Sequence, residues 1–249
     1  MGGEIERAAE LIATRKQVTV LTGAGISVES GIPDFRSEDG LWTRYDPQEY
    51  GTIYAFRREP AKVWKMLAEM EKVLDAADPN PAHFALARLE ESGVVQGIIT
   101  QNIDGLHQKA GSRCVIEFHG SHRTLSCLEC GKSYTREEAR GRGVPPPCEC
   151  GTLLKPDVIF FGEEIPRQAL VESNRLAQGC GVMLVIGTSA EVAPANQMPW
   201  VAKRNGAVVV EVNLVSSEIT RHLTDVFLQG PAGRVMHQLA EAVVQRLGL

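Results

Sequence analysis

Short apolar runs rich in β-branched residues alternate along this chain with segments whose apolar residues recur at the spacing of one helix face. The runs predict buried strands, and they lie at residues 18–21, 94–100, 115–118, 182–186 and 207–212, with a weaker one at 225–228. The helical patterns lie at residues 4–16, 60–76, 81–92, 166–178, 193–205 and 231–247. Strands that alternate with helices predict an α/β fold in which a parallel sheet is covered on both faces.

Two stretches depart from this alternation. Residues 32–85 form a long connection between the first two strands, with many aromatic residues and no clear strand. Connections of this length are often functional lobes. Residues 122–156 hold clustered cysteines, several charges and a run of three prolines, which builds little apolar core. This composition predicts a small insert that something other than apolar packing holds together.

The composition narrows the class of protein. The 249 residues include 26 Lys and Arg against 31 Asp and Glu, so the formal net charge is −5. This mild acidity argues against a dedicated nucleic-acid binder, which usually has a basic face. No apolar run approaches the roughly 18 residues of a membrane span, and the acidic start lacks the basic and apolar regions of a signal peptide. A cytoplasmic protein is expected.

Four of the six cysteines fall within 24 residues and have the spacing of a metal site: Cys127, Cys130, Cys148 and Cys150. Four thiolates favour one tetrahedral zinc ion, and because they leave no open coordination position the zinc would be structural. The second pair is C-x-C rather than the commoner C-x₂-C, and a redox or metal-free cluster is the alternative. Cys114 and Cys180 lie among apolar residues and are expected to be inert core thiols.

Glycines follow the first predicted strand, in the segment Thr22-Gly23-Ala24-Gly25-Ile26-Ser27. Such a turn before a helix N-terminus can bind phosphate through free backbone N–H groups. Val28 stands where a dinucleotide fingerprint has its third glycine, so an ordinary dehydrogenase turn is disfavoured. A diphosphate-binding turn of another pattern and a plain tight turn both remain open.

Polar residues also follow three other predicted strands, in the segments 100–104, 187–189 and 211–213. Ligands of open parallel sheets bind beyond the carboxyl ends of the strands, so these segments predict one nucleotide crevice. Ordinary turns and helix caps use the same residue types. For Asn102 and Asp104, an Asx turn that caps a helix at 104–110 is equally compatible.

His119 ends a strand-like run and precedes Gly120. A histidine at this place is suited to act as a general base near neutral pH. A hydrogen-bonded structural histidine is the alternative, and spacing alone does not separate His119 from His83, His107 and His122.

Taken together, these motifs resemble those of the sirtuin family, the NAD-dependent protein-lysine deacylases, in the short catalytic core of bacterial and archaeal members. The matching segments come in the family's order from residue 22 to about 232. They are Gly23-Ala24-Gly25-Ile26-Ser27, Gly31-Ile32-Pro33-Asp34-Phe35-Arg36, Gln101-Asn102-Ile103-Asp104, His119-Gly120, the two cysteine pairs, Phe161-Gly162-Glu163, Gly187-Thr188-Ser189 and Val212-Asn213.

The resemblance implies one catalytic domain over residues 1–249, with a Rossmann-like NAD-binding lobe and a small lobe. The large lobe would comprise residues 1–31, 86–121 and 157–249. The small lobe would comprise a helical insert at 32–85 and a zinc module at 122–156.

The resemblance also implies roles for single residues. His119 would be the general base that acts through the ribose hydroxyls, Asn102 would order ribose and water, and Asp104 would bind the nicotinamide carboxamide. The implied NAD contacts are Gly23, Ala24, Gly25, Ile26, Asp34, Phe35, Arg36, Trp42, Gln101, Asn102, Ile103, Asp104, Gly187, Thr188, Ser189, Asn213, Leu214, Val215 and Ala232. The segment 158–163 resembles the strand that pairs with the substrate peptide, through Val158, Phe160, Phe161, Gly162 and Glu163. The four clustered cysteines would hold the structural zinc.

In the family reaction the acyl-lysine carbonyl oxygen attacks the anomeric carbon as nicotinamide leaves, and free lysine and O-acyl-ADP-ribose follow. Family members that remove succinyl or malonyl groups carry a Tyr and an Arg at positions that hold Leu67 and Met70 here. We therefore expect a monomeric enzyme that acts on acetyl and other uncharged acyl groups of protein lysines. ADP-ribosyl transfer is the nearest alternative, and an NAD oxidoreductase or a non-enzymatic zinc-ribbon module is more remote.

Overall fold

The main sheet has six parallel strands in the order β3–β2–β1–β7–β8–β9. The computed structural model describes residues 2–35, 37–38 and 40–249. Counted within this sheet alone, the strand order is 3-2-1-4-5-6, the doubly wound order of dinucleotide-binding folds, which reverses between β1 and β7. The predicted α/β fold with a parallel sheet is confirmed. The strands are β1 (Val18–Thr22), β2 (Val95–Thr100), β3 (Val115–Glu117), β7 (Val182–Ile186), β8 (Val208–Asn213) and β9 (Val226–Gln229).

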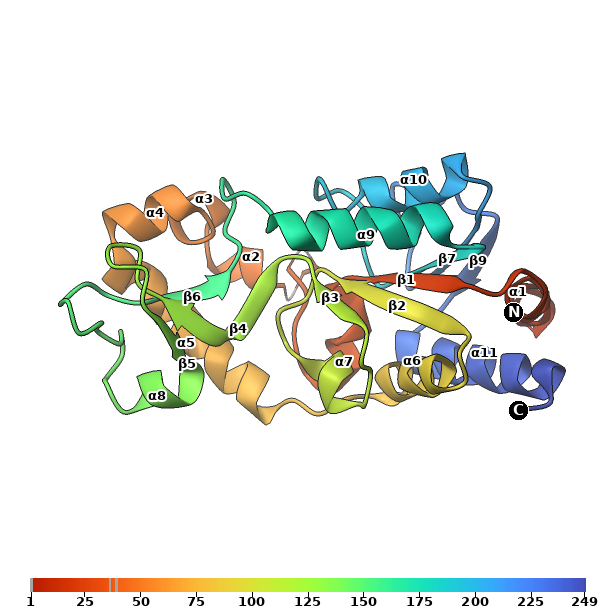
Figure 1. Cartoon of the computed structure of the whole chain (residues 1–249), viewed down its shortest axis with the longest axis horizontal. Helices are drawn as coiled ribbons and strands as arrows, with labels where there is room; N and C mark the ends of the chain where they lie inside the picture. Colours follow the sequence, from red (N-terminus) through yellow and green to blue (C-terminus); the bar gives the residue numbers. More distant parts are fainter. Residues whose placement is uncertain (1, 36, 39) are drawn as a thin grey trace.

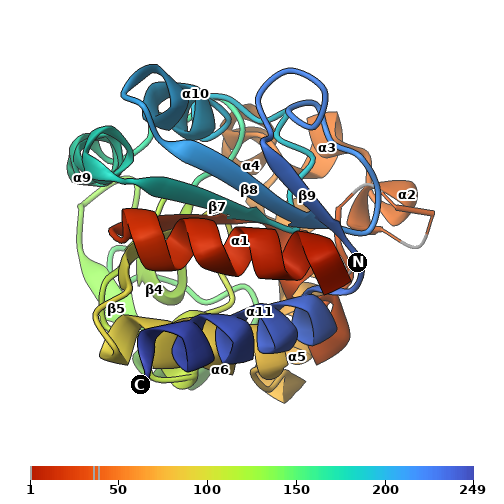
Figure 2. The ribbon, with the colours of Figure 1, turned by 90° about the vertical axis from the view of Figure 1, so that its right-hand side faces the viewer.

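Helices cover both faces of this sheet (Figure 2). One face packs against α1 (Gly2–Arg15), α6 (Pro81–Glu91) and α11 (Ala232–Leu247), and the other against α9 (Arg167–Gly179) and α10 (Gln197–Arg204). Side chains of alternate parity enter the two cores, as Val20 and Leu21 do. Both parities are buried in β1 and β7, which explains the unbroken apolar run of β7, while β1 also buries Thr19 and Thr22.

A smaller lobe lies beside the main sheet, at the left of Figure 1, while both chain termini lie at the right. Its core contains Trp64, whose Nε1 donates a hydrogen bond to Leu154 O at 2.8 Å and joins the helical insert to the cysteine-bearing insert. Ile103, just past β2, packs against the same core, so the carboxyl ends of the main strands face this lobe. Its elements are α2 (Leu41–Arg44), α3 (Pro47–Tyr50), α4 (Ile53–Arg58), α5 (Pro60–Ala76), β4 (Gly120–Ser126), β5 (Ser133–Thr135), α8 (Arg136–Arg140) and β6 (Lys155–Val158).

The three strands of the small lobe form an antiparallel sheet in the order β5–β4–β6. The predicted lobe boundaries stay a prediction, and the structure adds that Ala82 and Ala85 of α6 pack in the large-lobe core. Within residues 2–35, 37–38 and 40–249, no helix has the length and apolar character needed to cross a membrane.

Candidate active site

The turns that follow β1 and β7 pack backbone against backbone at the point where the strand order reverses. Gly23 N donates to Ile186 O at 3.0 Å, and Gly25 N donates to Gly187 O at 2.8 Å. A Cβ on Gly187 would lie 2.4 Å from Ile26 N, and its φ is +60°, a region that favours glycine. We call Gly23, Gly25 and Gly187 the glycine corner. Its tight packing explains these glycines without a ligand, so the alternative of a plain tight turn is structurally sufficient for them.

Gln101 connects the glycine corner to the end of β2. Its backbone N–H donates to Thr22 O at 3.0 Å, and its Nε2 donates to Thr188 Oγ1 at 3.0 Å. Asn213 Nδ2 in turn donates to Thr188 O at 3.0 Å. Polar groups at the ends of β1, β2, β7 and β8 therefore form one continuous network, as the strand-end motifs predict.

A second, buried network lies under the turn after β1. Asn102 Nδ2 donates to Gly23 O and to Ser27 Oγ, each at 3.2 Å, and Ser27 Oγ donates to Asp104 Oδ2 at 2.7 Å. Asp104 Oδ1 accepts from Leu106 N at 2.9 Å, so the Asx turn also exists and begins the short helix α7 (Leu106–Lys109). The two interpretations of Asp104 are thus compatible, because each carboxylate oxygen has its own partner.

Ser27 is the residue of this network to which the sequence motifs assigned no role. It is fully buried and contacts both Asn102 and Asp104. The available signal was a hydroxyl between the apolar residues Ile26 and Val28, directly after the glycines. Its partners lie 75 and 77 residues away, so the sequence could not identify them.

His119 lies between β3 and β4 and is partly buried. Its Nδ1 is 3.1 Å from Gln101 O, and because a carbonyl only accepts, Nδ1 carries the proton and Nε2 keeps a free lone pair. Burial lowers the pKa of His119, and the bond to Gln101 opposes this with a smaller effect. The ring is therefore neutral at pH 7 and can accept a proton at Nε2.

His122 has a similar arrangement but a less favourable charge environment. Its Nδ1 is 2.5 Å from Ile103 O. Burial lowers the pKa of His122, and the bond to Ile103 opposes this with a smaller effect. The positive charges of Arg136 and Arg123 lower the pKa as well, while the negative charge of Asp104 raises it with the smallest effect. A base becomes positively charged when it accepts a proton, so those guanidinium groups oppose that role for His122. Within the part of the chain that the structure describes, no cation lowers the pKa of His119.

His83 and His107 form a buried pair with ring centroids 4.9 Å apart. His107 Nε2 is 3.0 Å from Thr22 Oγ1, and Asn80 N donates to His83 Nδ1. Burial lowers the pKa of His83 to about 4 and that of His107 to about 3. Among the described residues the other ring nitrogens, His83 Nε2 and His107 Nδ1, have no hydrogen-bond partner. Both rings are therefore neutral at pH 7, and they pack behind Thr22 at the end of β1.

Three aromatic side chains bring the helical insert toward segment 158–163. The ring centroid of Phe35 is 5.4 Å from that of Trp42, which is 6.4 Å from that of Phe161. The loop is closed by hydrogen bonds from Leu41 N to Asp34 O and from Trp42 N to Phe35 O. Arg36, predicted to contact NAD, lies outside the described residues.

The predicted peptide-pairing strand is shorter than the sequence resemblance implies. Strand β6 ends at Val158, and Phe161 makes an isolated bridge to Thr52. The backbone then turns at Gly162, whose φ is +86°. Val158 and Phe160 bury their side chains in the small-lobe core, whereas Phe161 is 44% exposed. Among the described residues neither the N–H nor the C=O of the exposed Gly162 has a hydrogen-bond partner.

The residues predicted beside adenosine differ in accessibility. Leu214 and Val215 are exposed, while Ala232 packs in the large-lobe core. At the N-terminus of α11, next to Ala232, Gly233 N donates to Glu29 Oε2 at 2.5 Å. A carboxylate therefore already occupies this helix end, which disfavours a second anion there.

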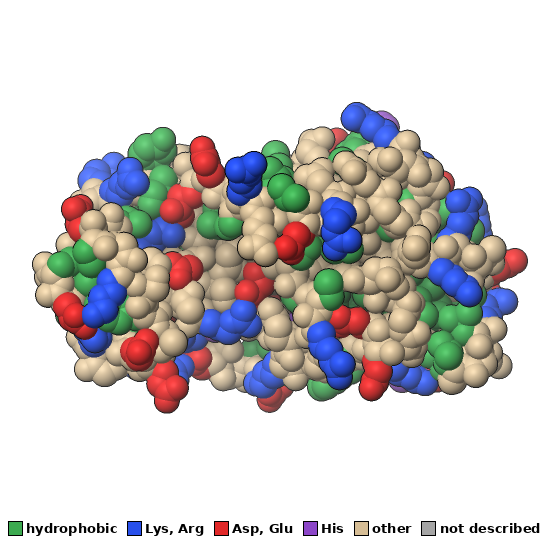
Figure 3. Space-filling view, in the orientation of Figure 1, with side chains coloured by type: hydrophobic (Ala, Val, Ile, Leu, Met, Phe, Trp, Pro, Cys, Tyr) green, Lys and Arg blue, Asp and Glu red, His purple; other side chains and the backbone are tan. Residues whose placement is uncertain are grey.

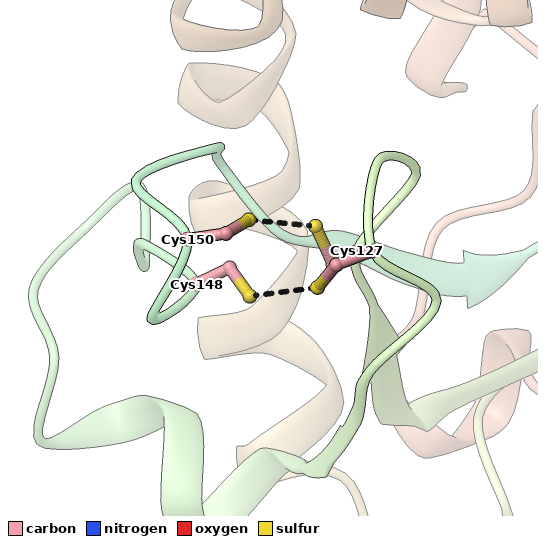
Figure 4. A group of neighbouring side chains, drawn as sticks. Cys127, Cys148 and Cys150 are labelled. Atoms are coloured by element: carbon pink, nitrogen blue, oxygen red, sulfur yellow. Dashed lines mark hydrogen bonds between the residues drawn. The ribbon is translucent and has the colours of Figure 1, made fainter.

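The four clustered cysteines converge from two loops of the small lobe (Figure 4). Their Sγ atoms all lie within 4.8 Å of one another, with 3.5 Å between Cys127 and Cys150 and 3.6 Å between Cys130 and Cys148. A disulfide would require about 2.05 Å, whereas sulfurs around a tetrahedral zinc lie about 3.8 Å apart. The donor set therefore fits one structural zinc ion.

The chain matches the family model of the Sir2 family over residues 23–194. The NAD-dependent protein deacylase 2 of Pyrobaculum aerophilum is 49% identical over 240 residues, which cover 96% of each chain. The NAD-dependent protein deacylase 2 of Archaeoglobus fulgidus is 45% identical over 248 residues, covering 98% of this chain and 97% of the relative.

Solved structures agree with these relatives. A structure from a study of the mechanism and regulation of Sir2 enzymes has a TM-score of 0.94 at 45% identity and covers 99% of this chain and 100% of its own. A Sir2 homologue in complex with NAD has a TM-score of 0.90 at 43% identity, covering 97% and 94%. A Sir2 protein with a deacetylated p53 peptide and 3′-O-acetyl-ADP-ribose has a TM-score of 0.90 at 34% identity, covering 98% and 99%. With motifs, fold and cysteine cluster in agreement with these matches, the chain belongs to the Sir2 family, the sirtuins.

Proposed function

We propose that this chain is an NAD-dependent protein deacylase in which His119 is the general base and the acyl group removed is acetyl or another uncharged group. The observation that carries the proposal is the hydrogen-bonded path from His119 through Gln101 to Thr188 and Asn213. It joins a neutral imidazole to the edge of the sheet at which this fold class binds nucleotides. The relatives named above are NAD-dependent protein deacylases.

In this proposal the glycine corner receives the diphosphate, and Asn102 and Asp104 hold the nicotinamide-ribose end. Asn102 has little freedom, because Gly23 O and Ser27 Oγ both accept from its amide. Fixed polar groups reduce the reorganisation that a reaction requires. The aromatic group Phe35, Trp42 and Phe161 would exclude water from the reacting centre.

The substrate would be a peptide that adds an extended strand beside segment 158–163. The unpartnered N–H and C=O of Gly162 can pair with a peptide backbone, a mode that tolerates many sequences. The Sir2 protein solved with a deacetylated p53 peptide supports a peptide substrate. Phe161, exposed beside Gly162, would contact the substrate's side chains.

The acyl preference follows from the positions that hold Leu67 and Met70. Both side chains pack in or against the small-lobe core. Burying the carboxylate of a succinyl group without a cation is costly, so an uncharged acyl group is favoured.

Initial rates on acetyl- and succinyl-lysine peptides of one sequence test both the activity and the preference. We expect NAD-dependent turnover that is faster on the acetyl peptide. The double variant Leu67→Tyr/Met70→Arg should lower the ratio of the acetyl rate to the succinyl rate, or bring it below one. Faster succinyl removal by the unmodified chain would contradict the preference, and no turnover of either peptide would contradict the activity.

We also propose a cytoplasmic monomer that does not bind nucleic acid directly. A reducing compartment would keep the four cysteine thiols available to zinc. The face in Figure 3 mixes Lys and Arg with Asp and Glu and carries no large basic patch, in keeping with the formal net charge of −5.

A further inference from the structure

Lys155 is a buried cation in the small lobe. It lies in β6 and is only 5% exposed. Its Nζ donates to Pro156 O at 3.1 Å and to Val158 O at 2.8 Å, and lies 3.0 Å from Glu163 Oε2. An ammonium has three N–H donors, so each donor has an acceptor from within residues 156–163.

Glu163 completes this arrangement from the other end of the segment. The same Oε2 atom accepts from Phe160 N at 2.8 Å, and Glu163 N donates to Phe160 O at 3.0 Å. The backbone from Pro156 to Glu163 is thus wrapped around one ammonium and one carboxylate. Glu163, predicted from the sequence as a peptide contact, directs its carboxylate inward to this pair.

The wrapped segment also contacts the surroundings of the proposed active site. Ile159 N donates to His119 O at 2.9 Å. Phe161 N donates to Gly51 O at 2.9 Å, and Phe161 O accepts from Ile53 N at 3.0 Å. These bonds hold the segment on both sides, and the turn at Gly162 projects from it with free backbone groups.

We infer that Lys155 and Glu163 are positioning residues for substrate: the ion pair between buried Lys155 and partly buried Glu163 sets the backbone of 159–163 and thereby the edge that Gly162 offers to the acyl-lysine peptide. The inference rests on the proposed peptide-pairing role of this segment. Neither side chain need touch substrate, because Lys155 is saturated by internal acceptors and acts through the backbone. The pair should therefore affect peptide recognition far more than recognition of NAD, whose proposed contacts lie on the large lobe.

The test compares the zinc-loaded full chain with Lys155→Met, Glu163→Gln and the double variant Lys155→Met/Glu163→Gln in deacetylation kinetics. We expect Lys155→Met to raise KM for an acetyl-lysine peptide by about tenfold or more and to leave KM for NAD within about twofold. Glu163→Gln should have a smaller effect of the same kind. The double variant should be less impaired than Lys155→Met, because it leaves no unpaired carboxylate in this partly buried position.

Two features of the experiment distinguish a specific effect on peptide binding from a smaller fraction of folded enzyme. KM does not depend on how much enzyme is active, so a selective rise in peptide KM reports on the site. Lys203→Met is the matched control, since Lys203 pairs with Asp225 on the surface of the large lobe and should leave both KM values unchanged. Equal rises in both KM values, or an unchanged peptide KM in Lys155→Met, would overturn the inference. Absence of turnover in the unmodified chain would instead overturn the proposed function.

Discussion

Ser27 donates its hydroxyl hydrogen to Oδ2 of Asp104 across 2.7 Å, and both side chains are buried. The same hydroxyl accepts from Asn102 Nδ2 at 3.2 Å. One serine therefore fixes both an amide and a carboxylate that we place around the nicotinamide-ribose end of NAD.

Ser27→Ala removes a donor from Asp104 and an acceptor from Asn102. We expect the free energy of unfolding to fall by about 1–3 kcal/mol. Deacetylation kcat/KM should fall by about tenfold or more, which corresponds to about 1.4 kcal/mol in the barrier. Denaturant unfolding and steady-state kinetics measure the two effects. Ser92→Ala is the control, because Ser92 Oγ donates to Arg88 O of its own helix turn and, within residues 2–35, 37–38 and 40–249, has no second partner. Kinetics equal to those of the unmodified chain would contradict the assigned role.

Gly187→Ala tests the packing of the glycine corner. Its added Cβ would lie 2.4 Å from Ile26 N, so the two turns must separate. Gly206→Ala is the matched control: Gly206 also has a positive φ, +89°, but a Cβ there would meet nothing within 4 Å. The control should lose about 1–2 kcal/mol from the left-handed backbone alone. Gly187→Ala should lose clearly more and should also raise KM for NAD. Equal losses in the two variants would mean that the contact between the turns is unimportant.

Zinc should be present at one ion per chain and should hold the cysteine-bearing insert together. Cys148→Ser removes one of four ligands, and we expect bound zinc and the melting temperature both to fall. Elemental analysis and thermal unfolding measure this. Cys114→Ser serves as the control, since Cys114 lies outside the cluster and is exposed rather than in the core, where Cys180 alone of the two expected core thiols is buried. A full complement of zinc in Cys148→Ser would contradict the assignment.

The pH dependence of catalysis should report on His119. Its pKa is held below the ordinary value of 6.5 by burial, and only the neutral ring can accept a proton. Activity should therefore be near its plateau at pH 7 and decline as the pH falls below 6.5. A profile of kcat/KM against pH measures the acid limb. We expect His122→Ala to keep that limb and His119→Ala to abolish turnover. If instead His122→Ala lost the acid limb of the kcat/KM profile and His119→Ala kept it, His122 rather than His119 would be the base.

The pH dependence of stability should report on the buried pair His83 and His107. Their pKa values, about 4 and about 3, lie below the value of 6.5 for an unfolded chain. The unfolded state therefore binds protons that the folded state does not, and stability should decrease as the pH falls from 6.5 toward 4. Melting temperatures across this range should show a shallower decrease for His107→Gln. His237→Gln, at an exposed position, should leave the slope unchanged. A pH-independent melting temperature in the unmodified chain would contradict the buried neutral pair.

The main sheet could be predicted from the sequence because its strands are apolar on both faces, as in Val182–Ile186. The antiparallel sheet of the small lobe was missed. In β4 only Leu125 is fully buried, and the other positions are partly or wholly exposed, so its apolar pattern is weak. The order of this region comes instead from cysteine convergence and long-range hydrogen bonds such as Trp64 to Leu154.

In the candidate site, too, local sequence patterns predicted some residues, and long-range contacts determined the others. Strand-end motifs predicted the residues that meet at the glycine corner, because parallel strands end at one edge of a sheet. The buried partners were not predictable: Ser27 meets Asp104 across 77 residues. The strand expected over 158–163 ends at Val158, since Lys155 and Glu163 draw the following backbone into a turn. The sequence around a buried charged residue does not reveal which other residue will pair with it in the folded chain.

One measurement tests the central claim most directly. The zinc-loaded chain is incubated with NAD and an acetyl-lysine peptide, and the products are analysed by mass spectrometry beside those of His119→Ala. The account predicts nicotinamide, free-lysine peptide and O-acetyl-ADP-ribose in equal amounts from the unmodified chain and little deacetylated peptide from the variant. ADP-ribose attached to a protein side chain, or reduced NAD without loss of the acetyl group, would contradict it.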